Sequence, residues 1–291
     1  MKSFLPALTF CAALLTVSTS TSCANLKKAS ENYITRAVET GAFDAISTST
    51  SVDVIYTQTT GERSIMLYAP DNMIDDVRVK VEDATLKVGM KPNVNQCVIG
   101  EHGIEVRVSA PAVRRLEASS SGDIKLTNGL NATGDVYVVV GSSGDVIGGT
   151  VSCTGNVTLK TSSSGDIKFD TVSCKDFRTD ASSTGDVKLG DVTCTSFRAD
   201  ASSSGDVEIR KVACTDFWAN AGSSGDMEVD MLEARNVFAN AGSTGDIKLA
   251  GKCENADLSA DSSGDIKASR LVVEKRLSKR ENSGGSVVCG D

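Results

Sequence analysis

Between residues 186 and 205, apolar and polar side chains alternate, and the alternation slips by one residue every five or so positions. Alternation with a period of two is typical of a strand with one buried face, and each slip marks a corner. The pattern therefore predicts one coil of three or four short strands around a narrow core. The apolar or small residues of this stretch are Val187, Leu189, Val192, Cys194, Phe197, Ala199 and Ala201.

The same pattern recurs along most of the chain, marked by the motif Ser-[Ser/Thr]-Gly-Asp-[Ile/Val/Met]. A fixed period near 20 residues, in units rich in Ser, Thr, Val and Gly rather than in helix formers, indicates a solenoid of strands. We predict an all-β, right-handed parallel β-helix, because crossovers between parallel strands are nearly always right-handed. The motif glycines are Gly122, Gly144, Gly165, Gly185, Gly205, Gly225, Gly245 and Gly264.

The motif divides the chain into segments. Residues 43–118 lack the motif but still alternate, which predicts irregular first coils or a β cap over the open end of the core. Residues 119–270 carry the regular Gly-Asp repeat. Residues 271–291 are expected to form a last coil or a terminal cap, and residues 23–42, which have no clear apolar period, a tether.

Stacked coils place equivalent residues in columns about 4.8 Å apart. Two inward columns are predicted. The first contains Ile124, Val146, Ile167, Val187, Val207, Met227, Ile247 and Ile266. The second contains Phe177, Phe197, Phe217, Val237 and Leu258.

The Gly-Asp pair has a structural interpretation and a functional one. At a tight corner the glycine accepts a positive φ, and the aspartate can bond its own neighbouring backbone amides. Alternatively the stacked carboxylates bind Ca²⁺, which would make the protein a calcium-stabilised scaffold. We favour the turn role, because calcium-binding nonapeptide repeats have another period and a Gly-Gly-x-Gly signature that is absent here. The aspartates are Asp123, Asp145, Asp166, Asp186, Asp206, Asp226, Asp246 and Asp265.

Five of the nine cysteines occupy one repeat position, and Ala234 occupies this position in the repeat between Cys214 and Cys253. The alternation points them inward, where a free cysteine behaves as a small hydrophobic residue. Disulfides between adjacent coils are the alternative in an oxidising compartment. Free thiols are favoured, because parallel stacking spaces Cβ atoms about 4.8 Å apart rather than the preferred ~3.8 Å. These residues are Cys153, Cys174, Cys194, Cys214 and Cys253.

Composition excludes several functions. The formal net charge of −8 and the acidic isoelectric point argue against nucleic acid as a partner. His102 is the only histidine, so sites with several histidine ligands are excluded. Aromatic residues make up only 4% of the chain, which suits a narrow core better than a bulky enzyme. We predict no metal site and no cofactor.

The N-terminus predicts export. Lys2 precedes an apolar run over residues 4–17 that is too short to span a bilayer and is typical of a secretory signal. Cleavage is expected either before Cys23, with lipidation of that cysteine, or after Ala24. We favour the first, because the segment resembles a bacterial lipoprotein signal. Residues 1–22 are then the signal peptide, and Cys23 is the lipid anchor in the cell envelope, at the outer membrane; a periplasmic or secreted protein is the alternative.

One outward column combines cations with aromatic rings: Arg178, Arg198, Trp218 and Phe238. Asp180, Asp200, Asn220 and Asn240 flank it. Such a platform can stack sugar rings or the side chains of a partner protein. In the alternative interpretation, these side chains only support one another across strands, at about 0.2–1 kcal/mol per pair. The candidate ligand surface is Arg178, Arg198, Trp218, Phe238, Asn220 and Asn240.

Several local patterns together carry a family resemblance. They are Phe43-Asp44-Ala45-Ile46, Val52-Asp53-Val54, Ile104-Glu105-Val106-Arg107-Val108 with Pro111, Ser119-Ser120-Ser121-Gly122-Asp123, and Ser283-Gly284-Gly285-Ser286. The chain resembles the family called putative autotransporter adhesin head GIN domain over residues 40–291. The resemblance implies a β-helical fold and a location at the cell surface, and it supplies no catalytic residue.

The predicted function is that of a non-enzymatic, adhesin-like or structural lipoprotein of the cell surface. Its partners are expected to be glycans or surface proteins, and a lipid anchor alone ties it to the membrane. A carbohydrate-binding or carbohydrate-active β-helix is the alternative. A catalytic β-helix needs a local break in its repeat, and residues 119–270 contain none.

Overall fold

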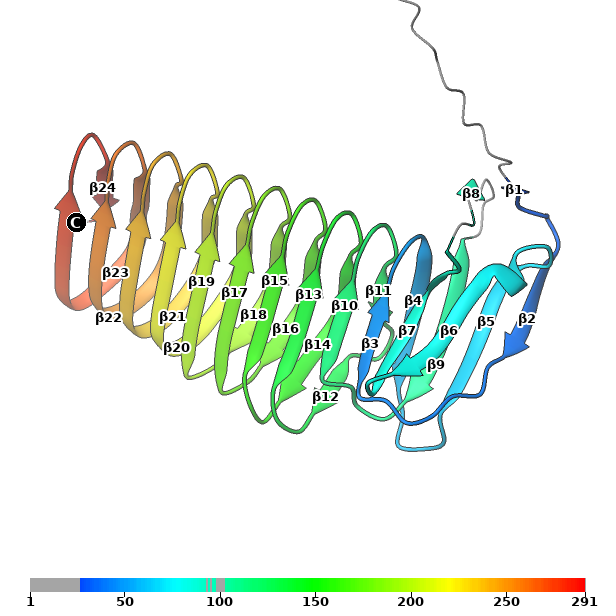
Figure 1. The fold of residues 1–291 in the computed structure, drawn as a ribbon. Helices are drawn as coiled ribbons and strands as arrows, with labels where there is room; N and C mark the ends of the chain where they lie inside the picture. Colours follow the sequence, from blue (N-terminus) through cyan, green and yellow to red (C-terminus); the bar gives the residue numbers. More distant parts are fainter. Residues whose placement is uncertain (1–26, 93, 95, 98–102, 291) are drawn as a thin grey trace, which may run out of the picture.

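The protein is a parallel β-helix of about nine turns, with coils of about 20 residues, as predicted. It is seen in a computed structural model that describes residues 27–92, 94, 96–97 and 103–290. Figure 1 shows parallel coils in a single row from β10 (Arg115–Ala118) to β24 (Ser286–Cys289), with a more irregular group of strands at the N-terminal end. The signal segment, Cys23 and His102 lie outside the described residues.

The N-terminal section contains both parallel coils and antiparallel strands. Its elements are β1 (Lys27–Lys28), β2 (Tyr33–Ala37), β3 (Ala45–Thr48), β4 (Val52–Gln58), β5 (Ser64–Pro70), η1 (Ile74–Asp76), β6 (Val77–Glu82), β7 (Thr85–Met90), β8 (Gln96–Cys97) and β9 (Ile104–Ala110). Strand β3 pairs in parallel with both β7 and β10, and β4 pairs in parallel with both β9 and β11 (Ile124–Leu126). The coil of β3 and β4 therefore lies between the coil of β7 and β9 and the first regular coil.

Antiparallel strands cover this end of the solenoid. Strand β5 pairs with β9 and with β2, and β6 pairs with β7. Residues 33–37, which belong to the predicted tether, form strand β2 of this cap. The polar composition of the segment concealed the strand, because β2 lies at an edge and only one side of it is paired among the described residues.

The regular coils are built from the remaining strands, each paired with its equivalent one coil away. They are β12 (Leu130–Ala132), β13 (Val136–Val140), β14 (Val146–Cys153), β15 (Val157–Thr161), β16 (Ile167–Ser173), β17 (Asp176–Ala181), β18 (Val187–Thr193), β19 (Ser196–Ala201), β20 (Val207–Ala221), β21 (Met227–Ala241), β22 (Ile247–Ala260) and β23 (Asp265–Glu281). Apolar alternation buries one face of every strand, and the buried residues form one continuous core along the axis.

The first predicted inward column is confirmed, since all eight residues pair in register and are buried. The second is confirmed from Phe177 to Val237, but Leu258 was assigned wrongly. Val237 pairs with Ala256, and Leu258 continues the neighbouring inward column after Ala239. The cause is an irregularity in the pairing of β21 with β22, where the register shifts between Val229 and Leu232 of β21.

The motif aspartates form hydrogen bonds between coils, a different arrangement from the one expected. The Oδ1 atom of each accepts the backbone N–H of the equivalent aspartate in the next coil, as from Asp206 to Asp186 at 3.1 Å and from Asp226 to Asp206 at 2.8 Å. The series begins at Asp53, which accepts from the Asp123 amide, and ends at Asp265, which accepts from the Ser286 hydroxyl. The aspartates therefore join successive coils rather than closing their own turns.

The motif glycine is required for close packing rather than for a positive φ. The left-handed residue is the serine two positions earlier, such as Ser203 with φ 60°. A Cβ placed on Gly205 would lie 2.8 Å from the carbonyl oxygen of Gly185 in the preceding coil. Val52 occupies the same corner position in the coil that precedes Gly122, so a side chain is accepted at this position in the N-terminal section.

The column of cysteines packs against the core as free thiols. Cys153 and Cys253 are buried, and the other three are partly buried. Burial raises the pKa of Cys174 and of Cys214 to about 12, so both are protonated at neutral pH and poor nucleophiles. Within the described residues, no group of three or more His, Cys, Asp or Glu side chains is placed to hold a metal ion.

The C-terminal end carries charged residues in inward columns. Strand β24 covers only residues 265–268 of β23. Further along β23, Lys279 pairs with Leu258 and Glu281 pairs with Ala260, so charged residues stand where earlier coils have apolar ones. The Oε1 atom of Glu281 accepts the Val287 amide at 2.6 Å. Inward charges discourage further strands from stacking on this end.

Candidate ligand-binding surface

The predicted ligand surface lies on one flat outer face of the solenoid, which we call the Trp218 face. It consists of β15, β17, β19, residues 216–221 of β20 and residues 236–241 of β21. Parallel register aligns Arg178, Arg198, Trp218 and Phe238 in one column, with Thr158 before them. Beside this column runs a second one that includes Asp180, Asp200, Asn220 and Asn240.

The aromatic pair projects from a rigid support. The rings of Trp218 and Phe238 stack with centroids 5.6 Å apart and planes 11° from parallel, and Phe238 is 41% exposed. In the adjacent inward column, Phe177, Phe197 and Phe217 stack at 4.9 and 5.0 Å. Two stacks of rings, one buried in the core and one partly exposed on the outer face, therefore support this part of the face.

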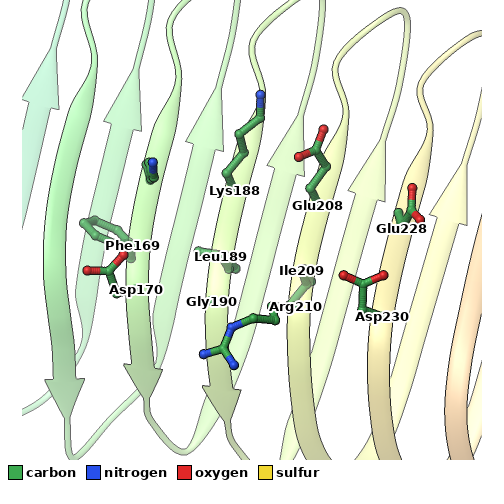
Figure 2. A pocket seen from close by; sticks show the side chains of 11 residues that line it. Phe169, Asp170, Lys188, Leu189, Gly190, Glu208, Ile209, Arg210, Glu228 and Asp230 are labelled. Carbon is green, nitrogen blue, oxygen red and sulfur yellow. The ribbon is translucent and has the colours of Figure 1, made fainter.

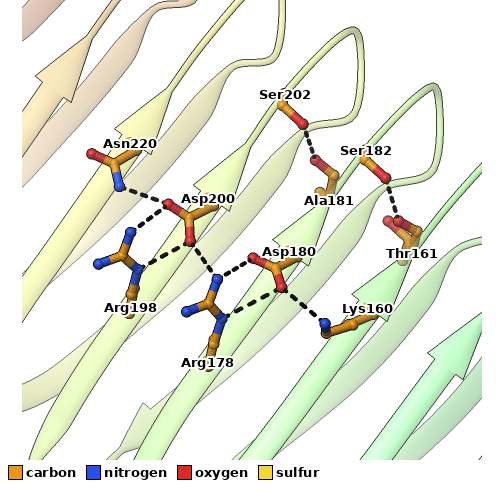
Figure 3. A network of polar contacts seen from close by, with 10 residues as sticks. All are labelled: Lys160, Thr161, Arg178, Asp180, Ala181, Ser182, Arg198, Asp200, Ser202 and Asn220. Carbon is orange, nitrogen blue, oxygen red and sulfur yellow. Dashed lines mark hydrogen bonds and ion pairs between the residues drawn. The ribbon is translucent and has the colours of Figure 1, made fainter.

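The two arginines of the face are bound to carboxylates, as Figure 3 shows. The guanidinium of Arg178 donates to Asp180 at 3.0 Å and to Asp200 at 3.2 Å, and Arg198 Nε donates to Asp200 at 3.1 Å. The amide of Asn220 completes the network by donating to Asp200 at 2.6 Å. The positive charge of this face is thus largely neutralised by the protein itself.

The pKa values follow from these contacts. Burial opposes ionisation of Asp200, but hydrogen bonds from Arg198 and Asn220 outweigh it and lower the pKa of the carboxyl group below its ordinary value. The pKa of Arg178 is raised, chiefly by its hydrogen bond to Asp180. Both groups are therefore charged at neutral pH.

A third column, which was not predicted from the sequence, runs along the other side of the aromatic pair. Asn236 Nδ2 donates to Asp216 Oδ1 at 2.8 Å, and Asn255 Nδ2 donates to Asn236 Oδ1 at 2.9 Å. Aligning the residues that follow the cysteine position in each repeat would have revealed this column. The aromatic pair is thus flanked by amides and carboxylates on both sides.

An open hollow of about 420 Å³ lies on the same face, on the N-terminal side of Trp218. Trp218, Arg178 and Arg198 border it together with Asn156, Thr158, Asp176 and Ser196. None of the last four was predicted as a site residue, because each is an ordinary polar residue whose significance depends on its neighbours in adjacent coils. Phe238, Asn220 and Asn240 belong to the same face but do not line the hollow.

A second hollow, of about 320 Å³, lies on another face and is shown in Figure 2. Its rim carries both signs of charge, with Lys188 in the same column as Glu208 and Glu228, and Arg210 pairs with Asp191 at 2.6 Å. Its charged side chains include pairs such as Lys188 with Asp186 at 3.3 Å. This face has the character of a charge-compensated outer surface.

Within the described residues, no helix has the length and apolar character needed to cross a membrane.

Comparison with solved structures places the fold among bacterial proteins of the same shape. A putative adhesin from Parabacteroides distasonis is 15% identical, with a TM-score of 0.69, and the match covers 88% of this chain and 100% of that one. A putative adhesin from Parabacteroides merdae is 16% identical, with a TM-score of 0.62 over 89% and 99% of the two chains. A putative lipid binding protein from Parabacteroides distasonis is 19% identical, with a TM-score of 0.51 over 91% and 100%. At these identities the likeness shows the fold.

No curated protein matches the chain significantly. The profile of the family described as "Putative auto-transporter adhesin, head GIN domain" matches residues 42–229 and 210–288, which is most of the sequence. The chain therefore belongs to this adhesin-like family, as its corner motifs and N-terminal strands predicted.

Proposed function

We propose that this protein is a non-enzymatic binding protein of the bacterial cell surface, and that the Trp218 face is its binding surface. The observation that carries the proposal is the stacked pair of Trp218, which is partly buried, and Phe238, which is 41% exposed, on one outer sheet face. Exposed aromatic rings on a fixed support are favourable contact points, because they bury apolar area with little loss of side-chain entropy.

The family description and the names of the structural neighbours support a binding role. The polar groups of the face support it too. The Asp180 and Asp200 carboxylates are held by arginines and an amide, so they serve to order the face. Glycans and surface proteins are the two partner classes that such a face suits.

Attachment to the envelope through Cys23 is part of the proposal. After cleavage before Cys23, acyl chains on that residue would hold the solenoid at the membrane, and each buried methylene contributes about 0.8 kcal/mol. Substituting Cys23→Ser should release the protein from the membrane fraction of the producing bacterium. Retention of the variant in that fraction would contradict the lipid anchor.

The binding role is tested with the soluble chain of residues 23–291 on an array of glycans and extracellular-matrix proteins. The double variant Trp218→Ala, Phe238→Ala should lose at least about tenfold in affinity for whichever partner binds, because hot-spot aromatics each contribute about 2 kcal/mol or more. Circular dichroism checks that the strands remain.

Met231→Ala is the matched control. Met231 is 54% exposed on the same strand, β21, but outside the Trp218 face, and its removal should leave binding unchanged. Full binding by the double variant would contradict the proposed surface, as would an equal loss in the Met231→Ala control.

A further inference from the structure

The hollow beside Trp218 has a wall that suits a sugar ring. Phe238 stacks on Trp218 from the following coil and does not border the hollow. The residues that border the hollow together with Trp218 come from preceding coils. Trp218 therefore stands between Phe238 and the hollow. An indole backed by another ring presents a fixed apolar surface to the C–H face of a pyranose.

Four polar side chains at the hollow have hydrogen-bonding capacity to spare. The side chains of Asn156, Thr158 and Ser196 form no hydrogen bond with other described residues. The Asp176 carboxylate has one contact, to Lys175 at 3.9 Å, which is longer than a hydrogen bond. In the neighbouring Asp200 network, by contrast, the polar side chains bond one another, as Figure 3 shows.

The charge balance selects among ligands. Arg178 and Arg198 already bind Asp180 and Asp200, so they offer little to an anion, and Asp176 repels one. Two hydroxyls, an amide and a carboxylate supply both donors and acceptors, and sugar hydroxyls can use both. The volume of about 420 Å³ lies within the range of small-molecule sites.

We propose that this hollow binds a neutral pyranose sugar, stacked on Trp218 and hydrogen-bonded to Asn156, Thr158, Asp176 and Ser196. The inference rests on the proposed function, since it specifies a ligand class for the same face. It also limits the sugar contacts to one part of that face, because Phe238 supports Trp218 without lining the hollow.

Trp218 is the only tryptophan in the chain, so intrinsic tryptophan fluorescence reports on this hollow alone. The soluble chain of residues 23–291 is titrated with glucose, galactose, mannose, N-acetylglucosamine and N-acetylgalactosamine, and with glucuronate and sialic acid as charged probes. At least one neutral sugar should change the emission in a saturable way and bind more tightly than either charged probe. Absence of saturation by every neutral sugar, or tighter binding of a charged one, would overturn the inference.

Two variants keep the reporter and remove the polar contacts. Thr158→Val and Ser196→Val are well tolerated on strands and each should weaken the sugar about tenfold, since each leaves one sugar hydroxyl without a partner. Thr35→Val on β2, far from the hollow in sequence, is the matched control and should change nothing. Unchanged affinity in both hollow variants would contradict the assigned contacts.

The outcomes separate this inference from the proposed function. If the array yields a protein partner that depends on Trp218 and Phe238, while no neutral sugar saturates the fluorescence, the binding surface stands and the sugar site falls. If a neutral sugar saturates the fluorescence but no surface material binds on the array, the sugar site stands and the proposed surface role falls.

Discussion

The regular coils and the N-terminal section both stack coils in parallel, but they differ in the order in which the chain forms those coils. In the regular coils, each strand pairs with the strand one repeat away, as Phe177 does with Phe197. In the N-terminal section, Ala45 pairs with both Thr85 and Arg115, so the coil of β3 and β4 lies between two coils formed later in the chain.

The difference teaches what the Gly-Asp motif is for. Where coils follow one another in order, a glycine permits close approach and an aspartate joins each coil to the next. Where the order is broken, Val52 replaces the motif glycine while Asp53 keeps the aspartate, and distant segments are joined by particular side chains. Tyr56, for example, is fully buried and its hydroxyl donates to the Pro111 carbonyl at 2.8 Å.

The largest expected effect comes from cutting the buried ring column. Phe197→Ala should lower the free energy of unfolding by about 3–5 kcal/mol, because a fully buried ring stacked on both sides is replaced by a cavity. Urea denaturation measures the loss. Because repeats contact only their neighbours, hydrogen exchange should accelerate in the coils around β19 and change little in β2–β9. Equal acceleration of hydrogen exchange in β2–β9 would contradict the expectation that the effect stays within the neighbouring coils.

A smaller effect is expected from the motif glycine. Gly205→Ala should cost about 1–3 kcal/mol, because its Cβ would press on backbone atoms of the preceding coil. Gly222→Ala is the control, since a Cβ there meets nothing within 4 Å. Thermal melting compares the two variants. If both melt alike, the glycine is not retained for close coil packing.

The smallest effect concerns pH and two aspartates of opposite behaviour. Burial, reinforced by the Asp186 and Asp226 carboxylates, raises the pKa of Asp206 above its ordinary value of 3.8. Its contribution to stability therefore falls as pH rises from 3.8 through the raised pKa. The pKa of Asp200 is lowered, so its contribution is present above pH 3.8 and is lost as pH falls through the depressed pKa.

Denaturation of Asp206→Asn and Asp200→Asn between about pH 3 and pH 6 tests these signs. Relative to the wild type, Asp206→Asn should gain stability as pH rises, because the asparagine cannot ionise and its oxygen still accepts the Asp226 amide. Asp200→Asn should be less stable than the wild type above pH 3.8, and this difference should shrink as pH falls below 3.8. If the stability of both variants changed with pH in the same direction, the opposite pKa shifts assigned to Asp206 and Asp200 would be contradicted.

The fold of the regular coils could be predicted because a solenoid turns sequence spacing into spatial adjacency. The same logic aligned Trp218 with Phe238. The prediction of spatial neighbours failed where the spacing between equivalent residues in the sequence no longer corresponds to one coil. The assignment of Leu258 was wrong by one column because the register shifts where β21 pairs with β22. Strand β2 was missed because its partner β5 is antiparallel and distant.

Finer features depended on contacts that no single repeat displays. The positive φ belongs to the serine and the close approach to the glycine, a division that composition alone does not reveal. The hollow beside Trp218 combines residues from four successive coils, from Asn156 to Trp218. Only their placement in space shows that the side chains of Thr158 and Ser196 form no hydrogen bond with other residues that the structure describes.

The uniform rung spacing has an evolutionary consequence. Each coil between β11 and β23 advances the axis by about 4.8 Å and presents the same edges to its neighbours. Duplication or loss of one coil by unequal recombination would thus change the length of the solenoid by a fixed amount. The coils on either side could still pair with each other. Adding or removing one coil before β20 would therefore change the distance between the N-terminal end and the indole of Trp218 by about 4.8 Å.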